Sequence, residues 1–99
     1  MAYRVETTRT ADQSYLQILQ YLIDNYGNQT AQKFEAAAKK CVKLLQDNPA
    51  LFEFNEDYDC RKAIIDRYTS MFYEVKNLVI IIHLFWHNRQ NPRDIEIKI

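Results

Sequence analysis

Residues 69–86 of the 99-residue sequence read TSMFYEVKNLVIIIHLFW, and this stretch decides the fold. Within it, residues 71–75 alternate between two sets of side chains, as a strand with two different faces does. Residues 78–86 are apolar at nearly every position, which predicts a strand inside a sheet with both faces covered. Lys76 and Asn77 suit a two-residue turn between the strands, because asparagine tolerates a positive φ angle. The stretch therefore predicts a β-hairpin.

Two amphipathic helices are predicted upstream of this hairpin. Apolar side chains recur with the spacing i, i+4, i+7, i+11 in residues 15–26 and again in residues 34–45, which is the period of a helix with one buried face. Residues 10–13, Thr-Ala-Asp-Gln, fit a capping box at the start of the first helix. Gly27 is expected to end that helix, and Asn28 to cap the next. A connection this short predicts an antiparallel helical hairpin.

The remaining segments complete the expected fold. Residues 3–7 are short, β-branched and alternating, which predicts a first strand, and residues 62–68 predict another. Residues 51–59 are expected to form a loop after Pro49, which ends the second helix. The order strand, helix, helix, strand, strand, strand predicts one α+β domain over residues 1–99. In it, the helical hairpin packs on one face of a small antiparallel sheet.

The composition is that of an ordinary globular domain, with 47% hydrophobic residues, 26% charged residues and no net charge. Residues 1–59 carry six Lys/Arg and nine Asp/Glu, whereas residues 60–99 carry seven and four, so an anionic partner should prefer the second part. A single glycine excludes glycine-rich phosphate loops. Cys41 and Cys60 fit no metal-ligand pattern, and no signal peptide or membrane span is apparent. We therefore expect reduced thiols, a cytoplasmic location, and neither metal nor cofactor.

Candidate catalytic residues follow the apolar strand. His87 can transfer a proton near neutral pH, and Arg89 can pair with a phosphate. Together with Arg61 and Arg67, they form a candidate set for cleaving an RNA phosphodiester. The alternative is structural: Arg89 and its neighbours then only form hydrogen bonds that fix the chain as it leaves the sheet.

Candidate binding residues lie on the hairpin strands. Lys62 belongs to a basic set with Arg61, Arg67 and Lys76, and Tyr68 and Tyr73 are interleaved with this set. Cationic and aromatic groups on one sheet face can bind phosphates and stack bases. The alternative is an ordinary half-buried sheet with a polar outer face. His83 lies in the middle of the apolar run and is expected to be a hydrogen-bonded core or interface histidine rather than a catalytic group.

The order of these residues resembles the RelE/ParE superfamily of bacterial toxins from type II toxin–antitoxin systems. The resemblance covers nearly the whole chain and is most specific in its second half. It rests on Tyr3-Arg4-Val5, residues 16–26, Ala31 with Phe34, Arg61-Lys62, residues 68–75, and the closing stretch Phe85-Trp86-His87-Asn88-Arg89-Gln90-Asn91-Pro92. It implies a compact α+β toxin that inhibits growth, is associated with plasmid stabilization, and is held inactive by a cognate antitoxin.

The superfamily contains two modes of action. RelE-like members cut mRNA on the ribosome without a metal, and ParE-like members inhibit DNA gyrase. RelE-like chains commonly carry Arg where this sequence has Thr69 and Ser70, and residues 95–99 contain no Tyr or His. The departures favour a ParE-like binding mode. In the alternative, ribosome-dependent endonuclease, His87 is the general acid or base, and Arg61, Arg67 and Arg89 stabilise the phosphate.

The antitoxin is expected to fold a segment onto exposed apolar surface, giving a toxin–antitoxin hetero-oligomer. Two places are open to it: the alternating tail of Ile95, Ile97 and Ile99, or a groove beside the helical hairpin. A third interpretation of the chain is an interaction module with no target of its own.

Overall fold

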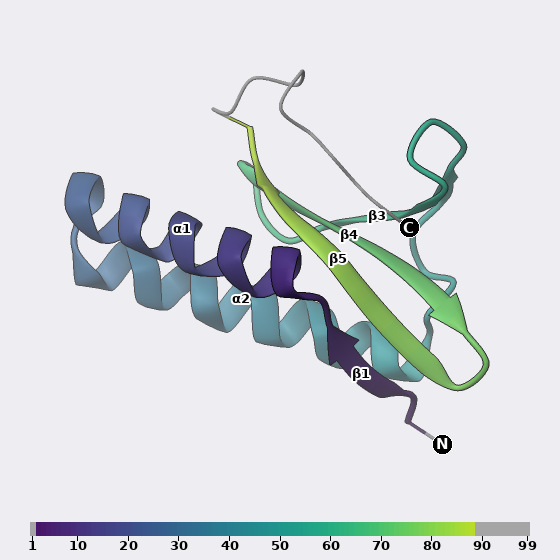
Figure 1. Ribbon diagram of the computed structural model, residues 1–99. Helices are drawn as coiled ribbons and strands as arrows, with labels where there is room; N and C mark the ends of the chain where they lie inside the picture. Colours follow the sequence, from purple (N-terminus) through teal and green to yellow (C-terminus); the bar gives the residue numbers. More distant parts are fainter. Residues whose placement is uncertain (1, 89–99) are drawn as a thin grey trace.

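The computed structural model describes residues 2–88. Two helices form an antiparallel hairpin against one face of a five-stranded sheet (Figure 1). The helices are α1 (Arg9–Tyr26) and α2 (Asn28–Asp47), and the strands are β1 (Arg4–Thr7), β2 (Phe54–Asn55), β3 (Cys60–Ile64), β4 (Thr69–Lys76) and β5 (Val79–His87). The predicted α+β fold, with a helical hairpin packed on a sheet, is confirmed.

The strand order is β1-β5-β4-β3-β2. Strand β5 has a neighbour on both sides, as the apolar run predicted. Strand β1 pairs with β5 in parallel, from Arg4 opposite Val79 to Thr7 opposite Ile82, so the sheet is mixed and not antiparallel throughout. The helical hairpin follows β1 directly and acts as a crossover, and a crossover is the kind of connection that parallel strands require.

Helix α1 begins earlier than its sequence pattern suggested. Its N-cap is Thr8, whose Oγ1 accepts a hydrogen bond from the Ala11 N–H at 3.0 Å. The predicted capping box at Thr10 is therefore wrong. The pairing with β5 explains the shift, because the Thr8 N–H donates to the Ile82 carbonyl and its Oγ1 donates to the His83 carbonyl. The helix starts at the residue where strand pairing ends.

Gly27 alone connects the two helices. It ends α1 as predicted, with a φ of 92° that favours glycine, and its N–H donates to the carbonyls of Leu22 and Ile23. It also stands at the N-cap position of α2, so Asn28 is the first helical residue and not the predicted cap.

The strands of the hairpin differ from their predicted bounds by a few residues. Lys76 pairs with Val79, so the turn consists of Asn77 and Leu78, one position later than predicted. Asn77 has the positive φ that the prediction required, at 58°. Strand β3 ends at Ile64, and residues 65–68 form the turn into β4.

A β-bulge in β5 sets the direction of its last side chains. Phe72 pairs with Leu84 and Tyr73 pairs with Ile82, so His83 is an extra residue between the two pairs. The alternation of faces shifts there, because a bulge opposes two residues to one. In consequence Phe85 faces the helices, as Ile82 does, although the two are three positions apart.

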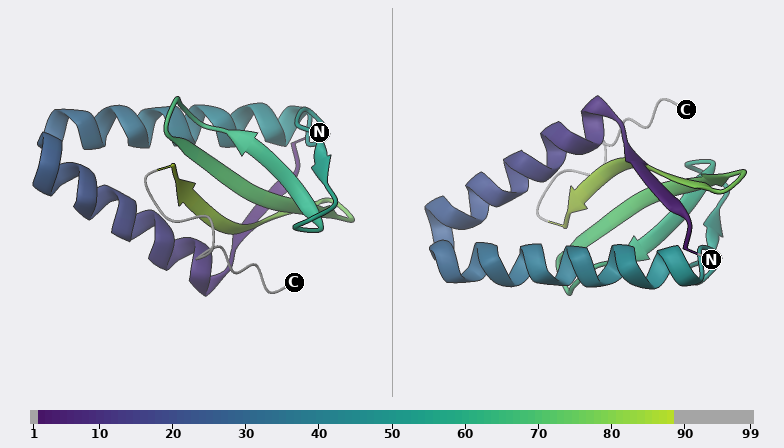
Figure 2. Two further views of the ribbon diagram at one scale, coloured as in Figure 1. Left: turned by 90° about the horizontal axis from the view of Figure 1, so that it is seen from above. Right: turned by 90° about the horizontal axis from the view of Figure 1, so that it is seen from below.

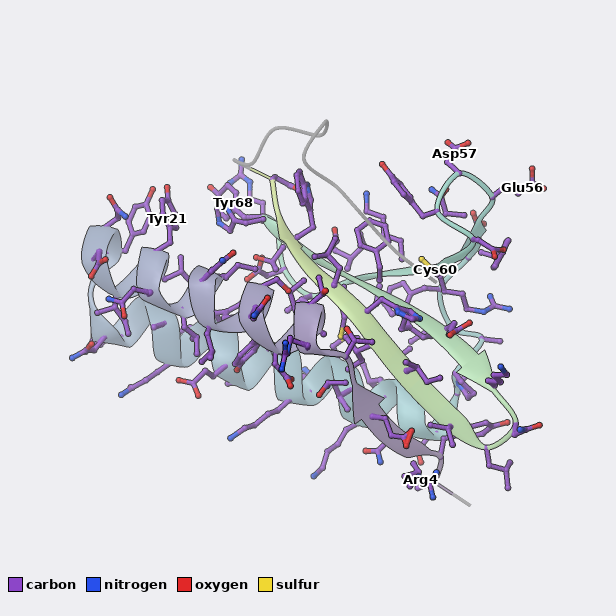
Figure 3. All side chains as sticks on the ribbon, in the orientation of Figure 1. Arg4, Tyr21, Glu56, Asp57, Cys60 and Tyr68 are labelled. Carbon is purple, nitrogen blue, oxygen red and sulfur yellow. The ribbon has the colours of Figure 1, made fainter. Side chains whose placement is uncertain are left out.

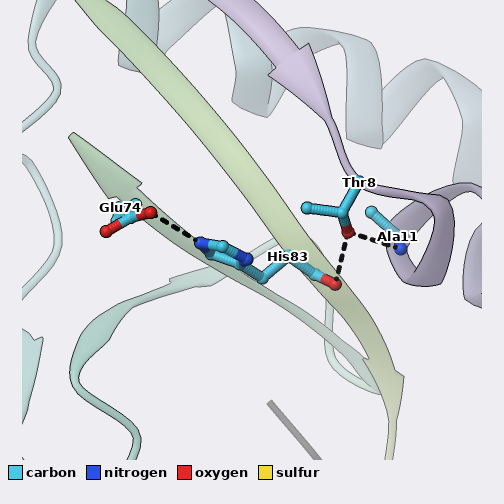
Figure 4. Close-up of polar contacts among 4 residues, drawn as sticks. All are labelled: Thr8, Ala11, Glu74 and His83. Atoms are coloured by element: carbon cyan, nitrogen blue, oxygen red, sulfur yellow. Dashed lines mark hydrogen bonds and ion pairs between the residues drawn. The ribbon is translucent and has the colours of Figure 1, made fainter. Parts of the chain in front are cut away.

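His83 is buried at the bulge and hydrogen-bonded, as predicted for a core histidine. Its Nε2 lies 3.0 Å from Oε1 of Glu74, and its carbonyl accepts from Thr8 (Figure 4). Beyond it, the Phe85 N–H donates to Oγ of the buried Ser14 on α1 at 3.0 Å. The hydroxyls of Thr8 and Ser14 thus bond β5 where β1 no longer reaches it.

The main core lies between the helices and the sheet. It is formed by buried apolar side chains from both layers: Ile18, Leu22, Phe34, Leu45, Met71, Tyr73, Ile80, Ile82 and Phe85. A smaller buried cluster on the other face of the sheet contains Cys60, Phe72, Leu84 and Trp86. None of the helices within residues 2–88 has the length and apolarity needed to cross a membrane.

Burial of the thiols predicts a loss of stability in alkali. The pKa of Cys60 is raised from 9.0 to about 11, chiefly by burial and further by the charges of Asp59 and Glu74. Burial also raises the pKa values of Cys41 and Tyr73. Above pH 9, the thiols of the unfolded chain lose protons that the native state retains, so the free energy of unfolding falls as pH rises.

Urea denaturation should show this contribution complete below pH 9 and lost up to about pH 11, with a decrease of about 3 kcal/mol from Cys60. The variant Cys60→Ala is the control, and its stability should depend less steeply on pH over the same range. An identical pH dependence in both proteins would show that Cys60 does not carry the effect.

Candidate functional site

Three aromatic side chains, those of Tyr21, Tyr68 and His87, form a cluster where β5 ends. His87 is the last residue of β5 and is 6% exposed. Its ring lies 5.3 Å from that of Tyr21 on α1 and stacks at 6.1 Å on that of Tyr68. Figure 3 shows Tyr21 and Tyr68 at the same end of the molecule, away from the loop that carries Glu56 and Asp57. The bulge creates this arrangement, because it turns His87 toward the helices.

Tyr68 is held in place by the turn between β3 and β4. The carboxylate of Asp66 accepts hydrogen bonds from the N–H groups of Tyr68 and Thr69 at 2.9 and 2.8 Å, an arrangement typical of a turn begun by aspartate. The Tyr68 carbonyl accepts from the Asn88 N–H, and the Asn88 side chain donates to the Arg67 carbonyl. The turn is therefore tied to the end of β5.

Arg67 and Tyr68 face outward from this turn. The Arg67 guanidinium lies 5.6 Å from the centre of the Tyr68 ring, within cation–π range, and Tyr68 is 46% exposed. Tyr26, at the end of α1, is also about half exposed. A hollow of about 150 Å³ between them is lined by Leu22, Tyr26, Thr30, Tyr68 and His87. We call the exposed residues Tyr26, Arg67 and Tyr68 the Tyr68 patch.

The patch has the composition of a protein-binding surface. Tyr and Arg are enriched at protein interfaces, and they dominate the few positions that supply most of the binding energy. A tyrosine held by a bonded turn and stacked on a buried ring also loses little conformational entropy when a partner covers it.

The structure separates the other predicted site residues. Tyr73 is 0% exposed, and its hydroxyl donates to the Pro49 carbonyl at 2.7 Å, so the prediction that it stacks on a ligand at the surface is wrong. It faces the helices because β4 alternates. Arg61 lies directly opposite it, and its Nη1 donates to the Phe52 carbonyl at 2.7 Å. Lys62 is exposed, one residue further along β3, on the other face of the sheet.

Of the candidate catalytic set, the structure brings His87 and Arg67 to the same end of the molecule, while Arg61 is bonded elsewhere. Arg89 lies outside the described residues, as do Ile95, Ile97 and Ile99. Thr69 and Ser70 are 2% and 4% exposed, so these two positions contribute to the interior of the sheet. Within residues 2–88, no three His, Cys, Asp or Glu side chains are placed to hold a metal ion.

Tyr21 and Tyr26 were not predicted as part of a site. Tyr26 belonged to the periodic apolar stripe of the first helix, and that pattern indicates burial. It gives no sign that the end of the stripe extends beyond the core. A short helix-ending segment with two tyrosines before Gly27 is the only signal in the sequence.

A helical hairpin packed on a five-stranded sheet is the α+β architecture that the resemblance to the RelE/ParE superfamily implied. The family model described as "ParE toxin of type II toxin-antitoxin system, parDE" matches residues 5–92. The chain therefore belongs to the ParE toxin family, and the predicted resemblance is confirmed.

The fold is also found in a chain of the structure "Chromosomal ParDE TA system from P. aeruginosa". The similarity covers 87% of this chain and 96% of that chain, with a TM-score of 0.73 and 22% sequence identity. At this identity, the comparison establishes the shared fold. No curated protein matches the sequence.

Proposed function

We propose that this toxin stops growth by binding a protein target in the ParE manner, with DNA gyrase as that target, and that a cognate antitoxin neutralises it. The toxin then acts in the cytoplasm and is stored as a toxin–antitoxin hetero-oligomer. The burial of His87 is the observation that carries the choice of a binding mode.

A general acid or base must lie within hydrogen-bond reach of the substrate proton. His87 is 6% exposed and is packed between two tyrosine rings, which is the environment of a packing residue. The surface above it offers Tyr68 and Arg67, which suit recognition of a protein. The identities of Thr69 and Ser70 further support binding, since neither side chain can present a cation to RNA.

Two assays on the same protein test the proposal. Purified toxin should inhibit DNA supercoiling by gyrase, and primer extension on mRNA from cells that express it should show no toxin-dependent cleavage sites. Cleavage sites together with unaffected supercoiling would contradict the proposal and establish the endonuclease alternative. Survival of cells that express the folded toxin without antitoxin would instead favour a module with no target.

The variant His87→Phe gives a sharper prediction. Phenylalanine keeps the aromatic packing against Tyr21 and Tyr68 but cannot transfer a proton. We expect growth inhibition to stay within about threefold of wild type, whereas removal of an acid–base group from an enzyme costs on the order of 10²-fold or more. Thermal melting of the purified variant is the control for folding. A folded variant with no growth inhibition would overturn the binding mode.

A further inference from the structure

The hollow beside the Tyr68 patch runs from the surface to the main core. Tyr26 and Tyr68 are about half exposed, whereas Leu22, which also lines the hollow, is 7% exposed and belongs to the main core. Thr30 and His87 complete the lining. Figure 2 shows why these residues meet, since the end of β5 and the turn between β3 and β4 both lie toward the end of the hairpin where α1 and α2 join. We call this hollow the Tyr68 socket.

The socket has the size of one side chain. Its volume is about 150 Å³. Sites for small molecules and cofactors usually measure about 300–1,000 Å³, so the socket is too small for a ligand of that kind. An apolar cavity of about 150 Å³ holds one benzene-sized group. Because the lining is mostly apolar, the occupant that fits is one large apolar side chain of a protein.

The walls of the socket are fixed before a partner binds. The Tyr26 ring meets that of Tyr21 at 6.2 Å in an edge-on contact, and the Thr30 hydroxyl donates to the Tyr26 carbonyl at 3.5 Å. Tyr68 stacks on His87 and is held by the bonded turn that follows β3. A preformed opening costs little to fill, because few groups must be ordered on binding. Well-packed pockets bordered by aromatic residues are where the dominant contacts of protein interfaces lie.

A positive charge lies at the rim of the socket. The guanidinium of Arg67 lies 5.6 Å from the centre of the Tyr68 ring, and the residue is exposed. The carboxylate of the preceding residue, Asp66, accepts hydrogen bonds from two backbone N–H groups. Neither of the ion pairs found within residues 2–88 includes Arg67, so it has no carboxylate partner in that part of the chain. The charge at the rim therefore favours an acidic group on the partner.

We propose that the Tyr68 socket takes one large apolar side chain of the target protein, and that a carboxylate beside this side chain on the target pairs with Arg67. The inference rests on the proposed function, because that function supplies gyrase as the target. It adds what the target must present, and it brings Leu22 and Thr30, which do not belong to the Tyr68 patch, into the contact. A second copy of the chain is a poorer occupant, since a symmetric contact would bring the two Arg67 side chains close together.

A substitution that fills the socket tests the proposal by inhibition. In Thr30→Trp, the larger side chain is expected to occupy the socket. The toxin concentration that halves gyrase supercoiling should then rise by about 30-fold or more, the usual effect of losing a dominant interface contact. Gln32→Trp adds the same bulk two residues along α2, at an exposed position on another side of the helix and outside the lining, and is the matched control. Equal inhibition by the two folded variants would overturn the proposal.

Cross-saturation in nuclear magnetic resonance tests the wild-type protein directly. The toxin is deuterated, labelled at its leucine methyl groups and mixed with unlabelled gyrase subunits, whose proton signals are saturated. The Leu22 methyl signals should lose intensity, because a target group inside the socket lies next to them. Leu45 is also buried but lies outside the lining, and its signals should keep their intensity. Unaffected Leu22 signals in the complex would overturn the proposal, and this experiment decides if Thr30→Trp does not fold.

Charge reversal tests the carboxylate on the target. Arg67→Glu should weaken inhibition by about tenfold or more, and the inhibition that remains should depend less on salt concentration. Lys76→Glu is the matched control, because Lys76 is exposed at the opposite end of β4 from the turn that carries Arg67. Equal inhibition by the two folded variants would show that no carboxylate of the target pairs with Arg67, and would overturn that part of the proposal.

The outcomes separate this inference from the function on which it rests. If the wild-type toxin does not inhibit gyrase supercoiling, the proposed function and the inference both fall. If it inhibits supercoiling, and Thr30→Trp inhibits equally or the Leu22 signals are unaffected, only the inference is overturned. A change in the Leu22 signals of the free toxin as its concentration rises would identify a second copy as the occupant and would also overturn it.

Discussion

Replacement of Phe85 by alanine should lower the free energy of unfolding by about 3–5 kcal/mol, the usual cost of removing a buried aromatic side chain. Phe85 is 5% exposed, and its ring meets that of Tyr15 at 5.0 Å in an edge-on contact. Tyr15 in turn contacts Phe34 at 5.4 Å. These three rings connect β5, α1 and α2, so the substitution removes one of the contacts that join the sheet to the helical hairpin.

Urea denaturation at neutral pH measures this effect. Leu78→Ala is the control, because Leu78 lies in the β4–β5 turn and is 61% exposed, and its replacement should change stability by about 0.5 kcal/mol or less. Since small domains have free energies of unfolding of about 5–15 kcal/mol, the Phe85→Ala variant is expected to be only marginally stable. A loss below about 1 kcal/mol would show that the three rings do not form one packed unit.

The sequence was sufficient for the pieces of the fold that depend on local periodicity. The apolar run predicted that β5 lies inside the sheet. The spacing of apolar residues in α1 and α2 predicted two amphipathic helices, with Gly27 at the end of the first. These features could be predicted because residues at regular spacing within one short segment form the same buried face. The parallel pairing of β1 was not accessible in this way, since it depends on contacts between distant segments.

The site was only partly predictable, and the bulge at His83 explains part of the difference. Alternation along a strand assumes two residues per repeat, and one extra residue reverses every face beyond it. His87, Arg67 and Tyr68 were identified as candidates, but the sequence did not reveal that His87 turns inward. The prediction for Tyr73 failed for another reason: it was grouped with nearby basic residues as an aromatic group on a binding face. Its hydroxyl is instead satisfied by a hydrogen bond to the Pro49 carbonyl, which allows the side chain to be buried.

Removal of the exposed ring at Tyr68 should produce the largest loss of target inhibition. We expect Tyr68→Ala combined with Arg67→Glu to weaken inhibition about 100-fold or more, since truncation of even one hot-spot tyrosine or arginine at an interface costs about 2 kcal/mol or more. The double variant removes the cation–π pair and the ring that stacks on His87, and it reverses the charge beside them. The measurement is the toxin concentration that halves gyrase supercoiling.

Phe54→Ala is the matched control for this surface. Phe54 is 50% exposed, similar to Tyr68. It lies in β2, the edge strand at the opposite side of the sheet from β1. Its replacement should leave inhibition within about twofold of wild type. Thermal melting of all variants separates lost binding from lost folding. Inhibition by a folded double variant that equals that of wild type would exclude the Tyr68 patch as the contact surface.

The pairing of β1 with β5 has a consequence for the time at which the toxin becomes active. Thr8 and His83, bonded to each other, are 75 positions apart in the chain. Contacts between such distant segments form late and slow the acquisition of structure. During synthesis, β1 emerges early and must wait for the strand beside which it will lie. A nascent chain therefore lacks a complete sheet until translation has passed β5, so the toxin cannot be fully folded before nearly all of the described chain has been made.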